Sequence, residues 1–348
     1  MMQSGRRTRR LLATALAFAL AGGMPLASQA QKDAQEGARR YDQGDYEGAL
    51  PYLEKAVEKG VKEGQTYYQL AYIYDRKGER EKAGAQREKA VPLLAKQAAS
   101  SKGTLEDAYY LTALYAQLQR ASDMRTAAQA GIYRFGKKED LSGEDLFRLG
   151  RLYQFAGNGE LSAATYRKSA QAMGHEKNAN PIFYSLALIS DASADIQARR
   201  YAEAADKLEQ AGTTNPKNPP PMFQTALMEL GAGRYAQARE HFGQVRDEAG
   251  MTEAQYGSDV ASHLEKAGGR LEADAEGKPW LEMDNQEIQD ALGAAAQAYR
   301  EARSSEQDSE HLAPAEKLFF SLAAEWMLRG NSLRELSLSG NYADLIRR

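Results

Sequence analysis

Apolar and small residues recur along this chain at helical spacing. The clearest stripe is formed by Tyr67, Leu70, Ala71 and Tyr74, which follow an i, i+3, i+4, i+7 pattern. Such a stripe predicts a helix with one buried face. No segment shows the alternating Val, Ile and Thr residues that are typical of a strand. The sequence therefore predicts an all-α fold.

The helical pattern returns at a fixed distance. The sequence ALPYLEKA at residues 49–56 recurs in weaker form as AGAQREKA at residues 83–90, which is 34 residues later. The turn at Gly44 recurs at Gly78 with the same spacing. A period of about this length, with two helices in each period, is typical of stacked helical repeats that bury a continuous core between neighbours.

These features resemble the tetratricopeptide repeat (TPR) family. The stripe from Tyr67 to Tyr74 matches the family's aromatic-x2-Leu-small-x2-Tyr pattern, and Leu146 to Tyr153 repeats most of it, whereas Ala108 stands where the family has a large residue. The resemblance covers most of residues 31–252. It implies an α-solenoid of about six irregularly spaced helix-turn-helix repeats, with the first helix of each repeat lining an inner wall.

We expect four segments along the chain. Residues 1–30 form a signal peptide, residues 31–267 form the TPR-like solenoid, and residues 268–280 form a loop or linker rich in glycine and charge. Residues 281–348 form a C-terminal helical region, in which degenerate repeats are one interpretation. Within the solenoid, residues 173–181 contain Gly, Asn and Pro and predict a break between helices.

The first 30 residues have the layout of a secretory signal. Four arginines precede an apolar run at residues 11–21, and residues 27–30 end in a small-x-small pattern. We expect cleavage after Ala30 and a periplasmic or secreted protein with no transmembrane anchor after cleavage. A retained N-terminal anchor is the alternative, although the apolar run is shorter than the roughly 20 residues that span a bilayer.

Charge and cysteine content exclude several function classes. The 348-residue chain has a net charge of −3 and no cysteine. A mildly acidic chain lacks the clustered positive charge that nucleic acids and anionic lipids select, so we expect no nucleic-acid partner. Without cysteine there is no disulfide, thiol nucleophile or zinc-thiolate site.

The remaining residue types give no catalytic pattern. The four histidines are far apart in sequence and outside any H-E-x-x-H motif, and they are His175, His241, His263 and His311. We place His241 on the solvent side of its helix, and we interpret Asp191 and Asp195 as i, i+4 neighbours on a solvated helix face. The sequence therefore predicts no metal, no cofactor and no enzymatic activity.

The TPR resemblance also implies positions that face a partner. These are the first-helix positions beside the packing stripe, where Tyr and Arg would supply the rigid rings and forked donors that are common at binding hot spots. The positions are Tyr68, Tyr72, Arg76, Tyr109, Phe147, Arg151 and Phe223. The alternative is that they are partly exposed supports of the solenoid. The positions that would match the family's carboxylate clamp in repeat one are Ala34 and Ala38, so that clamp is not expected.

Together these features predict a non-catalytic scaffold or adaptor of the bacterial envelope that binds a protein or peptide in the concave groove of the solenoid. The first alternative is an accessory subunit that binds an envelope glycan, either peptidoglycan or exopolysaccharide. A second is an enzyme with its active site in residues 268–348. Self-association through the C-terminal helices is a third.

Overall fold

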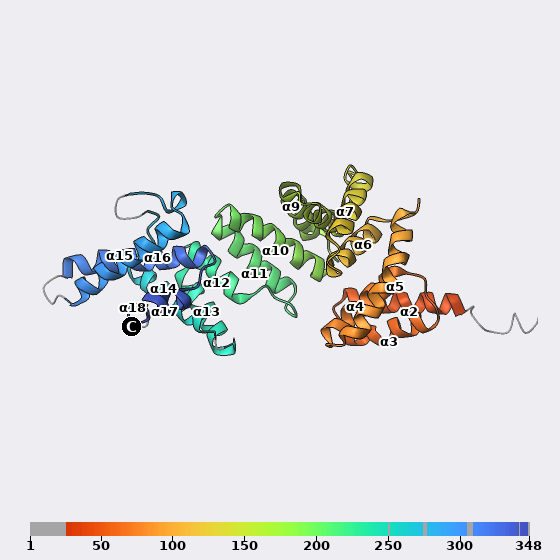
Figure 1. The fold of residues 1–348 in the computed structure, drawn as a ribbon, viewed down its shortest axis with the longest axis horizontal. Coiled ribbons are helices and arrows are strands. Elements are labelled where there is room, and N and C mark those ends of the chain that lie inside the picture. The colour runs from red at the N-terminus through yellow and green to blue at the C-terminus, as the bar shows by residue number, and fades with distance from the viewer. Residues whose placement is uncertain (1–25, 250, 274–276, 305–308, 341, 347–348) are drawn as a thin grey trace, which may run out of the picture. The chain divides into compact units, whose positions relative to one another are not determined.

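The computed structural model describes residues 26–249, 251–273, 277–304, 309–340 and 342–346. Over these residues the chain is helical, and the prediction of an all-α fold is confirmed (Figure 1). The strand-like pairing found in them is an isolated bridge between Ala273 and Pro279. The chain divides into two compact units, Met1–Tyr184 and Ser185–Arg348, which are described separately below.

The N-terminal unit consists of helix hairpins, and each hairpin is one repeat. Neighbouring helices pack on one another in sequence order, and the first helices of repeats three and four also contact each other. The helices are α2 (Leu26–Asp42), α3 (Tyr46–Glu58), α4 (Gly64–Arg76), α5 (Arg80–Ala99), α6 (Leu105–Gln117), α7 (Ala121–Phe135), α8 (Gly143–Phe155) and α9 (Gly159–His175), followed by the start of α10 (Pro181–Gln197).

The repeat stripe forms the core of this unit, as predicted. Leu70 and Ala71 are almost completely buried, and so are Ala49 and Leu53 of the preceding helix. Burial of a large apolar side chain contributes about 1.5–3 kcal/mol, so these contacts hold successive hairpins together. The predicted break at residues 173–181 is also confirmed, because α9 ends at His175 and α10 begins at Pro181.

The turn inside each repeat has one backbone conformation. In the first two repeats Gly44 and Gly78 have φ angles of 73° and 77°. The following residue donates its backbone N–H to the carbonyl five residues earlier, as Glu79 does to Tyr74 at 2.9 Å. This bond closes the end of the first helix in a Schellman turn. In the third repeat, however, the left-handed position is held by Gln119, with a φ of 57°.

The C-terminal unit continues the hairpin pattern and then adds a helix that covers it. Its helices after α10 are α11 (Tyr201–Thr214), α12 (Met222–Gly231), α13 (Tyr235–Ala249), α14 (Thr252–Lys266), the 3-10 turn η1 (Trp280–Glu282), α15 (Asn285–Ser304), α16 (Ser309–Leu328), α17 (Leu333–Gly340) and α18 (Ala343–Ile346).

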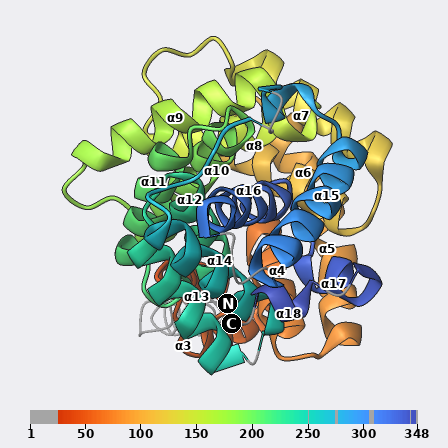
Figure 2. The same cartoon turned by 90° about the vertical axis from the view of Figure 1, so that its left-hand side faces the viewer.

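Helix α16 is the central helix of this unit. It packs against α12, α14 and α15 (Figure 2). Phe319, Phe320, Ala323 and Glu325 are completely buried. The half of α16 from Phe319 onward is therefore part of the core, whereas Ala313 and Pro314 in its first half are exposed. Because α12 is the first helix of its hairpin, α16 covers the side of α12 that would otherwise form part of the inner wall.

The predicted signal peptide lies mostly outside the described residues, because α2 begins at Leu26. Ala30, at the predicted cleavage site, is buried against the first repeat. Among the helices of the described part of the chain, none is both long enough and apolar enough to cross a bilayer.

Candidate partner-binding surface

Three tyrosine rings meet at the inner side of repeats one and two. Tyr41 at the end of α2 lies 5.3 Å from Tyr46 and 5.5 Å from Tyr72, measured between ring centroids, and the rings of Tyr46 and Tyr72 are 5.4 Å apart. The guanidinium of Arg76 lies over Tyr46 at 5.0 Å. Edge-to-face rings and an arginine on a ring face make a rigid surface that combines apolar area with positive charge.

A second group of tyrosines lies deeper, between repeats two and three. The ring of Tyr110 is 4.9 Å from Tyr68 and 5.3 Å from Tyr109. Gln117 donates a hydrogen bond from Nε2 to the hydroxyl of Tyr68 at 3.2 Å. Burial raises the pKa of Tyr68 and of Tyr109, while the nearby charge of Arg151 lowers both. Both phenols therefore stay protonated near neutral pH.

The start of α10 returns to the first repeat. Asn180 donates a hydrogen bond from Nδ2 to the carbonyl of Asp42 at 3.2 Å. The ring of Phe183 lies 5.4 Å from Phe147, and the guanidinium of Arg148 lies 5.0 Å from the centroid of Phe183. The first contact joins the residue before α10 to the end of α2, and the other two join the start of α10 to α8.

Arg148 is the buried cation of this region. It is 8% exposed and contacts the carboxylates of Glu106 at 3.1 Å and Asp145 at 3.0 Å. Asp42 faces the same cluster. Burial, and then the negative charge of Glu106, raise the pKa of Asp42 to about 6, although Arg148 lowers it. The inner side of the unit is therefore polar at its centre and aromatic around it.

The sequence-predicted binding residues fall into three environments. Arg76 is exposed, and Tyr72, Tyr109 and Arg151 are half-buried. Arg151 has its guanidinium 4.7 Å from the ring of Phe155 and donates to Gln154 at 2.8 Å. These four residues lie in the N-terminal unit.

The other three predicted residues are less accessible or lie elsewhere. Tyr68 and Phe147 are 8% and 3% exposed, because they pack in the ring clusters of the N-terminal unit, so they support the surface. Phe223 is half-buried in the C-terminal unit, with its ring 5.4 Å from Phe242. The structure therefore does not bring all seven residues into one surface.

Residues that sequence reasoning missed complete the surface. Tyr41, Arg148 and Phe183 all take part in the ring and ion-pair contacts described above. Tyr41 could have been found from the sequence, because it lies on the first helix three residues before the turn at Gly44. Phe183 could not have been found from the sequence, because its contact with Phe147 depends on how tightly the repeats curve.

The prediction that Asp191 and Asp195 lie on a solvated face is wrong. They are 3% and 2% exposed. Lys207 of α11 binds both carboxylates, with its Nζ 2.6 Å from Asp191, and Arg200 donates from Nε to Asp195 at 2.9 Å. Burial of the two acids is tolerated because cations from the next helix and the turn neutralise them.

His241 also differs from its prediction. It is half-buried, and its Nδ1 lies 2.8 Å from a carboxylate oxygen of Glu229, which is 2% exposed. Burial raises the pKa of Glu229, and the contact with His241 opposes that shift. His241 therefore serves as the hydrogen-bonding partner of a buried acid.

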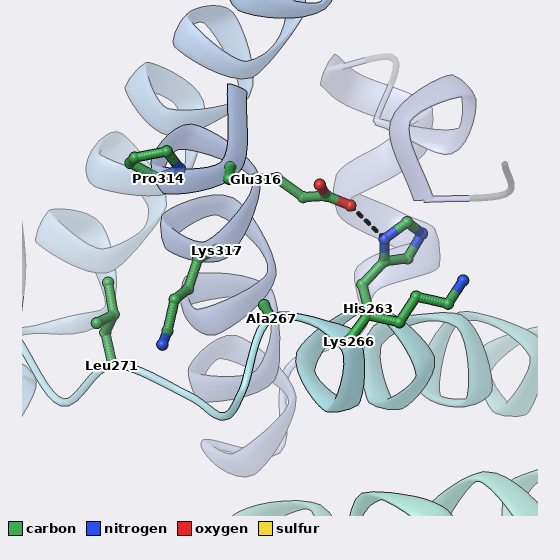
Figure 3. Close-up of a pocket in the computed structure, with 8 residues that line it drawn as sticks. His263, Lys266, Ala267, Leu271, Pro314, Glu316 and Lys317 are labelled. Carbon is green, nitrogen blue, oxygen red and sulfur yellow. Dashed lines mark hydrogen bonds and ion pairs between the residues drawn. The ribbon is translucent and has the colours of Figure 1, made fainter. Parts of the chain in front are cut away.

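A cavity of about 520 Å³ opens between the end of α14 and the first half of α16 (Figure 3). In its wall, Nδ1 of His263 lies 2.6 Å from Oε1 of Glu316, and the His263 ring stacks on Phe320 with ring centroids 3.9 Å apart. Lys317 points into the space beside Leu271. The lining residues include no hydroxyl or thiol nucleophile. In the described part of the chain, no group of three or more His, Cys, Asp or Glu is placed to hold a metal ion.

Comparison with known proteins gives the fold. No protein-family model matches the chain, and no curated protein matches it. The structure of the APC/C hetero-tetramer Cut9–Hcn1 matches with a TM-score of 0.50 and 15% identity, over 67% of this chain and 43% of that chain. A STAND protein from Pyrococcus horikoshii with a tetratricopeptide repeat sensor gives a TM-score of 0.46 and 15% identity, over 95% of this chain and 48% of that chain.

The molecule is an α-solenoid of helix hairpins. The 34-residue spacing, the equivalent turns and the likeness to Cut9–Hcn1 define it further as having the fold of TPR proteins. The chain spans less than half the length of the Cut9–Hcn1 chain that it matches. This likeness establishes architecture, and function has to be argued from the surface.

Proposed function

We propose that this protein is a non-catalytic, exported scaffold or adaptor whose N-terminal unit binds a protein or peptide of the bacterial envelope. The binding element is the tyrosine–arginine surface, formed by Tyr46, Tyr72, Arg76, Tyr109 and Arg151. These residues come from the first repeat's second helix and from the first helices of repeats two, three and four. Contributions from four successive repeats make one extended inner surface.

The placement of α16 supports this choice of unit. In the C-terminal unit, α16 packs on α12, which is the first helix of its hairpin, and on α14. In the N-terminal unit, the corresponding side carries Tyr72, Tyr109 and Arg151 half-exposed. Exposed aromatic and arginine side chains that are already held in place lose little conformational entropy on binding, which is why they are frequent at hot spots.

The chemistry of the surface favours a particular kind of segment. Tyrosine rings offer apolar faces with hydroxyl groups at their edges, and Arg76 and Arg151 offer forked donors. A segment with an aliphatic or aromatic side chain beside a carboxylate would satisfy both groups. Glu106 and Asp145 already neutralise the buried Arg148, so Arg76 and Arg151 remain the cations for a partner.

Two substitutions with matched controls test the proposal. We expect Tyr72→Ala and Arg151→Glu to abolish capture of the partner from crosslinked periplasm, since hot-spot truncations cost about 2 kcal/mol or more. Tyr133→Ala and Arg125→Glu change exposed residues of α7 and should leave capture intact. Equal circular dichroism spectra would show that all four variants fold. Unchanged capture by both test variants would overturn the proposal.

Export is part of the proposal and rests on the first 30 residues. Cleavage after Ala30 would remove residues 26–30 from α2 but keep Ala34, which is also buried in the core of repeat one. N-terminal sequencing of the protein from a periplasmic fraction should therefore begin at Gln31. Recovery of the full chain in a membrane fraction would contradict cleavage and leave the binding surface untouched.

An envelope glycan is the second candidate ligand. The hydroxyls of Tyr41 and Tyr109 form no hydrogen bond with another described residue, and a phenol can both donate to and accept from a sugar hydroxyl. Sedimentation with purified peptidoglycan separates this candidate from peptide binding. The glycan would be favoured if the wild-type protein sediments with peptidoglycan and the Tyr72→Ala variant does not.

A further inference from the structure

The cavity between the end of α14 and the first half of α16 has no part in the proposed partner binding, because that binding belongs to the N-terminal unit (Figure 3). Its volume of about 520 Å³ lies within the roughly 300–1,000 Å³ that small-molecule sites occupy. The walls of such sites are mostly apolar, and a few polar groups orient the ligand. The composition of this wall therefore indicates what kind of molecule it fits.

Apolar side chains form one part of the wall. Ala267 and Leu271 come from the segment directly after α14, and Ala313 and Pro314 come from α16. Leu271 remains 36% exposed. Its backbone N–H donates to Oγ of Ser321 at 3.0 Å, and Ser321 is completely buried on α16. This bond fixes the loop to α16, so the Leu271 side chain is held beside the cavity, where a ligand that covers it would remove its surface from water.

Lysines form the polar part of the wall. Lys317 is half-buried and lies one turn before Ser321 on the same face of α16. Its side chain points into the space beside Leu271 (Figure 3). Lys266 also lines the cavity and lies beside His263. The side chains of the two lysines form no hydrogen bond or ion pair with another described residue, so both ammonium groups are free to bind an anion.

The acid of the wall is already bound. Glu316 has its Oε1 2.6 Å from Nδ1 of His263. Glu265, the neighbour of Lys266 on α14, is paired with Arg239 at 2.9 Å. Two lysines therefore stand against one glutamate in the wall, which leaves an excess of one positive charge with His263 neutral. The wall thus combines apolar surface with unpaired positive charge.

We propose that this cavity binds a carboxylate with an alkyl chain of medium length, such as a fatty acid. The carboxylate accepts a charged hydrogen bond from Lys317, and the alkyl chain covers Leu271 and Pro314. Each CH₂ group that leaves water should tighten binding about fourfold. The charge of Lys317 discriminates against alcohols and amines of the same length, whereas the apolar wall discriminates against short carboxylates.

Calorimetric titration of the full chain tests both parts of the ligand. Sodium octanoate, sodium acetate and 1-octanol are added separately at equal ionic strength, so that the head group and the alkyl chain are each tested alone. We expect octanoate to bind one site saturably, and acetate and 1-octanol to bind at least about tenfold more weakly. Binding of 1-octanol that is as tight as that of octanoate, or no binding of octanoate, would overturn the proposal.

Two variants with matched controls locate the site. Lys317→Glu should weaken octanoate binding at least about tenfold and should create binding of octylammonium, because it reverses the charge beside the alkyl chain. Lys217→Glu changes an exposed lysine of the same unit and should alter neither. Ala313→Phe fills the cavity from an exposed position and should abolish binding, whereas Ala298→Phe changes an exposed position of α15 and should not. Octanoate binding that survives both Lys317→Glu and Ala313→Phe would end the assignment.

Discussion

The two units use the same repeat position in opposite ways. At the end of the first helix, repeats two to four of the N-terminal unit have Tyr74, Tyr115 and Tyr153, whereas the first repeat has Arg40. The C-terminal unit has Asp195 and Glu229 at the corresponding place, five residues before the equivalent point of each turn. The backbone hydrogen bond that closes the turn is the same in both units. The repeat geometry therefore does not require an aromatic side chain there.

The difference shows what each choice demands of the surroundings. An aromatic ring needs only neighbours that pack, and Tyr74 adds a hydrogen bond from its hydroxyl to Glu54 at 2.8 Å. A buried carboxylate needs a specific partner, because an unpaired charge in the interior is far more costly than an unfilled gap. Lys207 and His241 are such partners. The C-terminal unit is thus held together by matched polar pairs in addition to packing.

Glu325 shows this dependence most clearly. It is completely buried on α16, and Arg199, Arg270 and Arg329 reach it from the α10–α11 turn, from the loop after α14 and from the position directly after α16. Arg329 also donates to the carbonyl of Met283 at 2.9 Å. One carboxylate therefore connects three segments of the unit through charged hydrogen bonds.

The largest expected effect follows from removing that carboxylate. Glu325→Gln leaves three arginines around a neutral amide, and we expect the C-terminal unit to lose about 3–5 kcal/mol of unfolding free energy. Urea unfolding followed by tryptophan fluorescence measures this directly, because both tryptophans of the chain, Trp280 and Trp326, belong to this unit. Glu335→Gln, at an exposed position of α17, should change little. A loss below about 1 kcal/mol would show that the cluster is dispensable.

The N-terminal unit should instead be sensitive to lost volume. Leu70 is 1% exposed, and Leu70→Ala should cost about 2–5 kcal/mol through the cavity that it leaves. Leu161→Ala is the matched control in the same unit, because Leu161 is 45% exposed. Thermal unfolding followed by circular dichroism should show a lower midpoint for the first variant only. Equal midpoints would mean that the repeat core tolerates a void.

Asp42, at the end of α2, is a half-buried acid of the N-terminal unit that makes no ion pair with another described residue. Its pKa rises from 3.8 to about 6, mainly through burial. The unfolded chain therefore loses this proton near its ordinary pKa of 3.8 and the folded state only near pH 6, so the penalty on folding grows between these two values and is complete above pH 6. Asp42→Asn removes this penalty and should stabilise the unit by up to about 3 kcal/mol at pH 8.

The same substitution should have no such effect at pH 4, because Asp42 is then largely protonated in the folded state. Unfolding free energies of the wild type and the variant at pH 4, 6 and 8 test the sign. Asp140→Asn, at an exposed position of the same unit, is the control. A gain that does not depend on pH would assign the stabilisation to something other than the charge.

Sequence periodicity was sufficient for the local architecture. The buried stripe at Leu70 and Ala71 follows from side-chain spacing along one helix. The turn at Gly78 follows from the left-handed backbone that glycine adopts readily. Both are local properties of the sequence. Periodicity could not show that Lys207 neutralises Asp191, because that contact joins two helices. It also could not show that Tyr68 is buried. The curvature of a solenoid accumulates from small rotations between repeats, and curvature decides which inner residues stay accessible.

The smallest expected effect concerns one turn in each unit, where a residue other than glycine has a positive φ angle. Gln119 in the N-terminal unit and Arg199 in the C-terminal unit have φ angles of 57° and 55°, where the other repeats have glycine. Gln119 is exposed and makes no side-chain hydrogen bond to a described residue. Gln119→Gly should therefore relieve strain and stabilise by up to about 1 kcal/mol, after the greater freedom of glycine in the unfolded chain is subtracted.

Arg199→Gly relieves the same strain but removes a charged hydrogen bond to Glu325, worth about 1.5–3 kcal/mol. The net change should therefore be a loss of about 1 kcal/mol, opposite in sign to that of Gln119→Gly. Chemical unfolding of both variants measures the pair under one condition. An increase in unfolding free energy for both variants would mean that the ion pair of Arg199 does not offset its backbone strain. The contrast between the two units, packing in one and paired charge in the other, would then not extend to their turns.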